Sequence, residues 1–362
     1  MKKKNKMFYC TRCCLPESSP KIKFDKFGIC NACRSSEQKM KINWGKREAI
    51  LKKILFFYKK KSKSNYDCIV PISGGKDSIY QLHVLKNKYN MNPLAVTFSH
   101  NWFTKTGIEN LNTSIEKLDV DHIMFTPKRS LVNRLAKKSL SAIGDACWHC
   151  HMGVETFPYQ IATKWNIKLM IYGESPSEFS GKDTYDKFKD LEVDHFLKGS
   201  AKINYKKMMG NEISENEMNV FKLPSTKDLI KIRRIFLGNY MFWDFEKQTE
   251  FVKKQYGWKE SNVEGTYKKY KSVECKMPGV HDYAKFLKRG YGRGTDFASN
   301  DVRAGLLTRE EGFKIAKKYD EKEPKSLDYY LQITGIKKKN FYKTLYNQRD
   351  SKAKNLPKKN VK

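Results

Sequence analysis

The stretch SGGKDS, residues 73 to 78, combines residue types that can bind phosphate. Gly74 and Gly75 let the backbone turn sharply and approach a ligand without a Cβ in the way. Lys76 adds a positive charge, Ser73 and Ser78 add hydroxyl donors, and the unpaired N–H groups of a following helix would add more. The pattern therefore predicts a phosphate-binding loop, with a glycine-rich turn that binds no ligand as the alternative.

Two carboxylates are candidates for chemistry beside such a loop. Asp77 would repel a phosphate unless Mg²⁺ lay between them, so metal binding is its expected role. Glu174 follows Gly173 at the end of an apolar run, IKLMIYG. We expect Gly173 to let a ligand come close, and Glu174 to act as a base or to position an attacking group.

Four of the nine cysteines form two CxxC pairs, Cys10 with Cys13 and Cys30 with Cys33, and sixteen residues separate the pairs. Four thiolates at this spacing are typical of a tetrahedral Zn²⁺ site. The first 40 residues hold few apolar side chains, so a metal would supply folding energy that no core can. Disulfides are the alternative, which a reducing cytoplasm disfavours. The pattern predicts a structural zinc ribbon over residues 1–45.

A further CxxC pair, Cys147 and Cys150 in GDACWHCHMG, lies in the middle of the chain, and Cys275 is distant from it. Three thiolates could hold an iron–sulfur cluster with one open iron. The pair could instead bind zinc with His149 or His151, or pack beside the nucleotide site without metal. The sequence leaves these alternatives open.

The elements that must position these residues follow from the apolar periodicity beyond about residue 64. Short β-branched runs alternate there with segments of helical spacing, which predicts parallel strands joined by helical crossovers. We therefore expect an α/β fold with a doubly wound parallel sheet. Ligands in such sheets bind outside the carboxyl ends of the strands, where SGGKDS would lie. The expected strands fall within 66–72, 92–99, 122–127, 167–175 and 233–244, and the expected helices within 78–89, 106–118, 131–143, 153–165 and 245–257.

The chain as a whole has 362 residues, enough for two or three domains. No apolar run approaches the roughly 18 residues of a membrane span, and no apolar segment follows the basic start, so we expect a cytoplasmic protein. The formal net charge of +33 suggests an acidic partner such as RNA. Of the 72 basic residues, however, 12 are Arg, which leaves 60 Lys. A diffuse, Lys-dominated excess indicates a composition bias rather than a nucleic-acid surface.

SGGKDS resembles the pyrophosphate-binding loop of the ATP pyrophosphatases and lacks the spacing of a Walker loop. A longer stretch, HDYAKFLKRGYGRGTDFASNDVRAGLLTREEGFKIAKKYD at 281–320, resembles the N-acetyl sugar amidotransferases of bacterial surface-polysaccharide and flagellin-glycan pathways. That resemblance extends to the ribbon, the loop, CWHCHMGVETFP and IYGES. It implies an ATP-pyrophosphatase-type α/β domain over 64–260 and a helical C-terminal region over 261–336. We expect the Lys-rich tail at 337–362 to be frayed.

The resemblance implies ATP-dependent amidation of an anionic sugar, such as a legionaminic or pseudaminic acid derivative. ATP would adenylylate the oxygen of an N-acetyl group, ammonia would attack the imidate carbon, and AMP would leave an acetamidino group. The implied cofactors are ATP and Mg²⁺, beside the Zn²⁺ of the ribbon. Lys76, Asp77 and Glu174 would be catalytic. The ATP-binding residues would be Ser73, Gly74, Gly75, Lys76, Asp77, Ser78 and Gly173.

Other features bear on the substrate and on the competing enzyme class. No glutaminase signature is evident, so ammonia would come from solution or from a separate glutaminase subunit. RGYGRGTD, at 289–296, predicts either a cradle for a sugar carboxylate or a tight turn between helices. SGKDT, at 180–184, echoes the loop and predicts either a flap or a plain surface loop. The competing class is the tRNA thiolases, which share the loop and use a CxxC pair in mid-domain, as at Cys147 and Cys150.

Overall fold

A five-stranded parallel sheet forms the centre of the computed structural model, which describes residues 7–178, 185 and 205–358. The strand order is β3-β2-β1-β4-β5, and every neighbouring pair is parallel. Such an order is that of a doubly wound sheet, so the predicted α/β class is confirmed. The SGKDT stretch at 180–184 lies outside the described residues. The strands are β1 (Cys68–Pro71), β2 (Pro93–Phe98), β3 (His122–Phe125), β4 (Leu169–Tyr172) and β5 (Arg233–Phe236).

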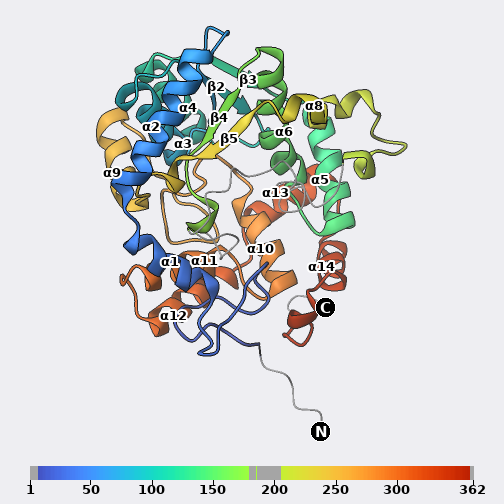
Figure 1. Cartoon of the computed structure of the whole chain (residues 1–362). Coiled ribbons are helices and arrows are strands. Elements are labelled where there is room, and N and C mark those ends of the chain that lie inside the picture. Colours follow the sequence, from blue (N-terminus) through green and yellow to red (C-terminus); the bar gives the residue numbers. More distant parts are fainter. Residues whose placement is uncertain (1–6, 179–184, 186–204, 359–362) are drawn as a thin grey trace.

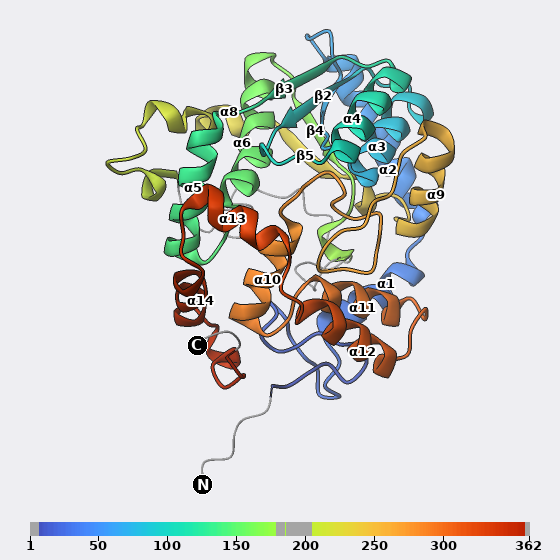
Figure 2. The same ribbon diagram turned by 180° about the vertical axis from the view of Figure 1, so that it is seen from behind.

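Helices cover both faces of this sheet (Figures 1 and 2). One face carries α2 (Trp44–Lys61), α3 (Lys76–His83), α4 (Lys105–Leu118) and α9 (Phe245–Tyr256). The other carries α5 (Arg129–Ile143), α6 (Trp148–Lys164) and the short α8 (Thr226–Leu229). The predicted crossover helices are therefore present, and α9 ends at Gly257, which adopts the left-handed conformation. The patterns did not predict α2, and α6 begins before the expected run and contains Pro158.

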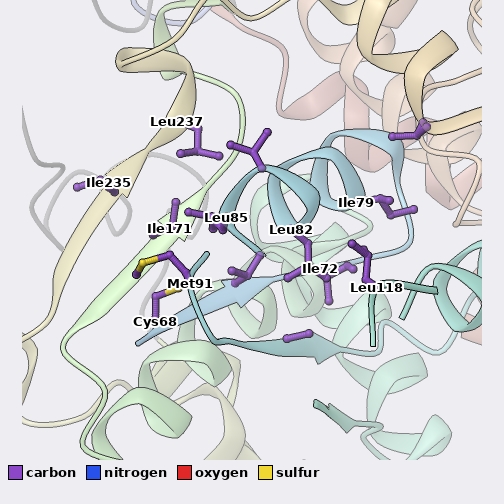
Figure 3. Packing of buried hydrophobic residues seen from close by; sticks show 14 of the residues in the cluster. Cys68, Ile72, Ile79, Leu82, Leu85, Met91, Leu118, Ile171, Ile235 and Leu237 are labelled. Carbon is purple, nitrogen blue, oxygen red and sulfur yellow. The ribbon is translucent and has the colours of Figure 1, made fainter. Parts of the chain in front are cut away.

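Alternate residues of the strands divide between two apolar cores, as a sheet buried on both faces requires. In β1, Cys68 and Val70 pack with α2, α3 and α9, whereas Ile69 packs with α6. Figure 3 shows part of the first core, where Ile79 and Leu82 of α3 lie over the sheet. These cores fix α3 against β1 and so fix the loop that joins them.

The C-terminal region is helical, as predicted, and it packs below the sheet in the view of Figure 1. Phe341 and Leu345 are fully buried against the neighbouring helices of this region. The expected fraying beyond residue 337 is therefore wrong for residues 338–353, because these apolar side chains recur at helical spacing among the lysines. The helices are α10 (Pro278–Arg289), α11 (Arg293–Arg303), α12 (Arg309–Asp320), α13 (Ser326–Thr334) and α14 (Lys338–Asn347).

The N-terminal residues lie against α11 and α12, two helices from the C-terminal part of the sequence (Figures 1 and 2). Cys10, Cys13 and Cys30 of the predicted ribbon precede α1 (Asn31–Lys41), and Cys33 lies in the first turn of this helix. Arg309 donates hydrogen bonds to the backbone oxygens of Cys10 and Cys13, which fastens the ribbon to α12. In the described part of the chain, no helix has the length and apolar character that a membrane span requires.

Candidate active site

A cavity of about 570 Å³ lies beyond the carboxyl end of β1, next to β4. The chain runs from β1 outward to β2 and β3 and then returns to β4 on the other side of β1. Doubly wound sheets bind their ligands at this switch point. Of the predicted catalytic and ATP-binding residues, only Gly74 does not line the cavity. The predicted residues that do line it are Ser73, Gly75, Lys76, Asp77, Ser78, Gly173 and Glu174.

The SGGKDS segment forms the turn between β1 and α3. Gly74 has φ +83°, and a Cβ added there would lie 2.7 Å from the backbone oxygen of Gly107. A glycine is therefore required, because an L side chain would be strained and would also clash. Trp258 donates from Nε1 to the Gly74 oxygen at 2.9 Å. Gly75 caps α3, so the free N–H groups of its first turn begin at Lys76.

The two serine hydroxyls bond within the loop. Ser78 Oγ donates to the Gly75 oxygen at 2.8 Å and accepts from the Ser73 backbone N–H at 3.3 Å. Ser73 Oγ accepts from the Gly75 N–H at 3.3 Å. The hydroxyls thus brace the loop in this structure. The predicted contact of Ser78 with a phosphate would require its bond to the Gly75 oxygen to open, whereas Ser73 accepts within the loop and could still donate its own O–H to a phosphate.

Four charged side chains meet beside the loop, of which Lys76 and Lys271 are buried and Asp77 and Glu174 are partly buried. Lys76 Nζ lies 2.5 Å from Asp77 Oδ1, and Lys271 Nζ lies 2.7 Å from Asp77 Oδ2. Lys271 also lies 3.2 Å from Glu174 Oε2. Two lysines therefore balance two carboxylates inside the cavity, which is the arrangement that makes buried charges tolerable. Three of the four were predicted, and Lys271 was not.

These surroundings shift the pKa values of the four groups. Burial raises the pKa of Glu174 to about 7, since the attraction of Lys271 is offset by the repulsion of Asp77. Burial lowers the pKa of Lys76 to about 8, although Asp77 opposes the shift. Burial alone would raise the pKa of Asp77, but the two lysines hold it below its ordinary value. Glu174 and Lys76 are thus placed to change protonation near neutral pH, as groups at reaction centres commonly are.

The segment that carries Lys271 also carries Glu274 and is held by long-range contacts. Thr104 donates from its backbone N–H to the Glu274 oxygen at 3.0 Å. A Cβ added to Gly107 would lie 2.2 Å from Glu274 Cα, so only glycine allows this approach. Within the described residues, Glu274 Oε2 is buried and accepts no hydrogen bond. Burial raises the pKa of the Glu274 carboxyl. No local sequence pattern marks this segment, which explains why it was not predicted.

Two arginines also reach the cavity. Arg234 of β5 pairs with Glu155 of α6 at 2.7 Å and lies 4.2 Å from the centre of the Tyr172 ring. Arg293, at the start of α11, pairs with Asp282. Both arginines line the cavity, and Arg234 was not predicted.

RGYGRGTD spans the end of α10, the turn at 290–292 and the first turn of α11, so the tight-turn alternative is correct for this stretch. Gly290 ends α10 in the left-handed conformation. Arg289 donates to the Ser18 oxygen at 2.8 Å and lies 3.2 Å from Asp350. Only Arg293 of the stretch lines the cavity, so the predicted cradle is reduced to one side chain.

Three cysteines outside the ribbon line the same cavity. Cys147, Cys150 and Cys275 are all among its lining residues, and so is His151. His149 is instead fully buried beside Trp102. Burial raises the pKa of the Cys275 thiol to about 12. The structure thus brings Cys275 to the same cavity as the CxxC pair, from which it is 125 positions distant in the sequence.

The four ribbon cysteines have the geometry of a metal site. The sulfur atoms of Cys10 and Cys33 lie 3.9 Å apart, those of Cys13 and Cys30 lie 3.7 Å apart, and those of Cys30 and Cys33 lie 3.6 Å apart. Sulfurs bound to one tetrahedral ion at about 2.3 Å lie about 3.8 Å from each other. The donor set therefore fits a single tetrahedral ion.

Comparison with known proteins adds one family match and one relative. Residues 264–360 match the family described as "LPS biosynthesis protein WbpG-like, C-terminal domain". An uncharacterized protein of Methanocaldococcus jannaschii is 24% identical over 329 residues, which cover 91% of this chain and 99% of that protein.

Two solved structures are similar to the chain at low scores. NMN synthetase from Francisella tularensis is 14% identical with a TM-score of 0.30, over 61% of this chain and 98% of the other. The U34-tRNA thiolase NcsA from Methanococcus maripaludis, solved with its 4Fe–4S cluster, is 14% identical with a TM-score of 0.34. That match covers 83% of this chain and 86% of the thiolase. At these scores neither structure bears on the activity of this chain.

Proposed function

We propose that this protein is an ATP-dependent amidotransferase that converts the N-acetyl group of an anionic bacterial sugar into an acetamidino group. The observation that carries the proposal is the SGGKDS turn between β1 and α3, which opens on a cavity with Lys76, Asp77, Lys271 and Glu174 in its wall. The match of residues 264–360 to a family named for lipopolysaccharide biosynthesis supports a surface-polysaccharide substrate. The resemblance of residues 281–320 to the N-acetyl sugar amidotransferases supports the reaction type.

The loop would bind the pyrophosphate end of ATP. Backbone N–H groups at the start of α3 and the ammonium group of Lys76 suit the negative charge of the β- and γ-phosphates. In the described structure both Lys76 and Lys271 are paired with Asp77. When phosphate attracts the two lysines, Asp77 is released to hold Mg²⁺, which would neutralise phosphate charge as pyrophosphate leaves.

Glu174 would serve the second half of the reaction. The amide oxygen of the substrate first attacks the α-phosphate and displaces pyrophosphate. Ammonia then adds to the imidate carbon, its nitrogen gives up a proton, and the C–O bond to AMP breaks. Glu174, whose pKa burial raises to about 7, is placed to accept that proton. The products are an acetamidino sugar, AMP and pyrophosphate.

The ribbon would hold Zn²⁺ in a structural role. All four positions of its tetrahedron are filled by Cys10, Cys13, Cys30 and Cys33, which leaves no open position for a substrate. These cysteines do not line the cavity. The ribbon is therefore proposed to stabilise the fold and not to take part in the reaction.

Mass spectrometry of candidate nonulosonic acids, incubated with the enzyme, ATP and ammonium, tests the proposed reaction. Amidation replaces one oxygen by NH and lowers the mass of the sugar accordingly, and one AMP should form for each sugar converted. The Lys76→Ala variant is the matched control for sugar turnover by contaminating enzymes. Failure of every candidate sugar to change mass while ATP is still cleaved to AMP would contradict the sugar amidation.

An ATP-dependent tRNA thiolase is the second candidate, and the observation that favours it is the presence of Cys147, Cys150 and Cys275 in one cavity. Sulfur transfer needs thiolates or a cluster, whereas amidation needs neither. The amidotransferase therefore predicts that Cys275→Ser keeps ATP-dependent amidation and that anaerobically purified protein lacks the broad visible absorbance of an iron–sulfur cluster. Loss of thiolated tRNA on deletion of the gene would favour the thiolase.

A further inference from the structure

A carboxylate, a thiol and an imidazole, three groups of types that can bind metal, lie close together. Two come from the N-terminal end of α6 and one from α10. An oxygen of Asp145, the sulfur of Cys147 and a ring nitrogen of His281 lie within 4.8 Å of one another. His281 Nδ1 is 3.7 Å from Asp145 Oδ1. Two atoms bound to one ion at about 2.1 Å lie about 3.4 Å apart at the tetrahedral angle. A small inward shift would therefore bring all three donors onto a single ion.

The backbone and the neighbouring side chains already hold the carboxylate in place. Cys147 donates its N–H to Asp145 Oδ1 at 2.8 Å, and His151 Nδ1 lies 3.2 Å from Asp145 Oδ2. Ser139 Oγ donates to the Asp145 backbone oxygen at 2.6 Å. The rings of His151 and His281 pack edge to face, with centres 5.1 Å apart. Contacts of this kind orient ligands in known metal sites.

We propose that Asp145, Cys147 and His281 form a second metal site, for a divalent ion of the zinc type. Thiolate, imidazole and carboxylate together suit zinc better than magnesium or calcium, which prefer oxygen ligands alone. A thiolate and a carboxylate balance the two charges of the ion, and the Cys147 thiol gives its proton to solvent as the metal binds. Such a site differs from the ribbon, where the ion has four sulfur ligands.

The ion would keep one coordination position open toward the cavity. Cys147 and His281 both line the cavity, whereas Asp145 does not. Three protein ligands with one open position is the arrangement of catalytic zinc sites. If the proposed amidation holds, on which this role rests, the open position would take ammonia, a small neutral donor, within the cavity that holds Glu174.

An iron–sulfur cluster on Cys147, Cys150 and Cys275 is the competing occupant. Of these three, only Cys147 belongs to a compact group of three donors among the residues that the structure describes. A cubane cluster is held by thiolates alone and needs neither Asp145 nor His281. Single substitutions therefore distinguish the two occupants. Loss of His281 or Asp145 should remove a zinc ion and not a cluster, whereas loss of Cys275 should remove a cluster and not a zinc ion.

Metal analysis of the full-length protein, loaded with zinc and dialysed, distinguishes them. We expect about two zinc ions per chain in the parent protein, and about one in His281→Ala and in Asp145→Asn, since the ribbon keeps its own ion. Cys275→Ser, which removes a cavity thiol outside the proposed ligand set, should keep both ions. His122→Ala is the matched histidine control, because His122 bonds to Thr97 on β2 and does not line the cavity.

The retained ribbon zinc, together with an unchanged circular dichroism spectrum, shows that a variant has folded. One zinc per chain in the parent protein would overturn the site. So would loss of metal from Cys275→Ser with His281→Ala unaffected, or the presence of iron and inorganic sulfide. For the ammonia role, His281→Ala should raise the KM for ammonium and leave the KM for ATP unchanged, and an unchanged ammonium KM would overturn that role. If no sugar is amidated at all, the proposed function fails while the zinc count still decides the site.

Discussion

Lys271 Nζ lies 2.7 Å from Asp77 Oδ2, an ion pair between residues 194 positions apart in the chain. The pair joins the SGGKDS loop to a segment without regular secondary structure that leads into α10. Since Asp77 also contacts Lys76, its charge is compensated twice before any nucleotide binds. A bound phosphate would draw on these same lysines, so the proposed binding of ATP would rearrange this network.

Lys76→Ala should abolish ATP-dependent turnover and leave the fold intact. The substitution removes a charge-assisted contact with phosphate, about 1.5–3 kcal/mol in binding before any contribution to the transition state. AMP formation measures the effect. Lys268→Ala is the matched control, because Lys268 is also largely buried and ion-paired, with Glu246 and Asp301, but does not line the cavity. Near-normal AMP formation by Lys76→Ala, or an equal loss in Lys268→Ala, would contradict the assignment.

Two pH profiles should report the two groups separately: kcat/KM for ammonia the pKa of Glu174, and kcat/KM for ATP the pKa of Lys76. Glu174 must be ionised to accept a proton, so kcat/KM for ammonia should rise with pH through its pKa of about 7. Lys76 must be protonated to bind phosphate, so kcat/KM for ATP should fall as pH rises through its pKa of about 8. Ammonia is counted as the free base at each pH, to remove its own ionisation from the profiles. Glu174→Gln should lose the acid limb of the ammonia profile, and persistence of that limb would exclude Glu174 as its origin.

Cys30→Ser should lower the zinc content by about one ion per chain and cost more than about 4 kcal/mol of stability, as loss of a structural metal does. Cys14→Ala is the matched control. Cys14 is fully buried beside the first pair, where its thiol faces the Arg309 oxygen at 3.6 Å, but it lies outside the four-sulfur group. Metal analysis and thermal unfolding measure both variants. A Cys30→Ser protein with unchanged zinc content would refute the ribbon site.

Gly107→Ala should destabilise the protein by about 1–3 kcal/mol and reduce turnover. The added Cβ would lie 2.2 Å from Glu274 Cα, so the segment that carries Lys271 must move away from α4. Gly45→Ala is the control in another helix. Its Cβ would meet nothing closer than 3.5 Å, and the change should add about 0.5–1 kcal/mol of stability. Denaturant unfolding and AMP formation measure both, and equal behaviour of the two variants would contradict the close approach.

The sequence predicted those parts of the site that have local patterns. Ser73 to Ser78 could be identified because strand, glycine turn and helix follow one another within a few residues. The strands and crossover helices could be identified because burial on both faces requires apolar runs of definite length.

The remaining site residues have no local signal. Lys271 and Glu274 reach the cavity through pairing with residues 102–104 and through the space that Gly107 leaves, and neither contact can be read from adjacent residues. Helix α2 was missed because its pattern is weakly amphipathic, with Phe56 70% exposed among lysines. Helix α14 was taken for a frayed tail because its lysines mask the apolar stripe that includes Phe341 and Leu345.

The hydrogen bond from Arg309 to the backbone oxygen of Cys13 can form only late in the synthesis of the chain. The two residues are 296 positions apart, so the ribosome must add nearly the whole chain before the ribbon can meet α12. At about 5–20 residues per second, that interval is on the order of 15–60 seconds. A nascent ribbon that binds its ion at once would wait in a folded form, whereas a metal-free one would expose four thiols to oxidation throughout. Zinc supply during translation would then govern the yield of active protein, even though the ion is proposed to take no part in turnover.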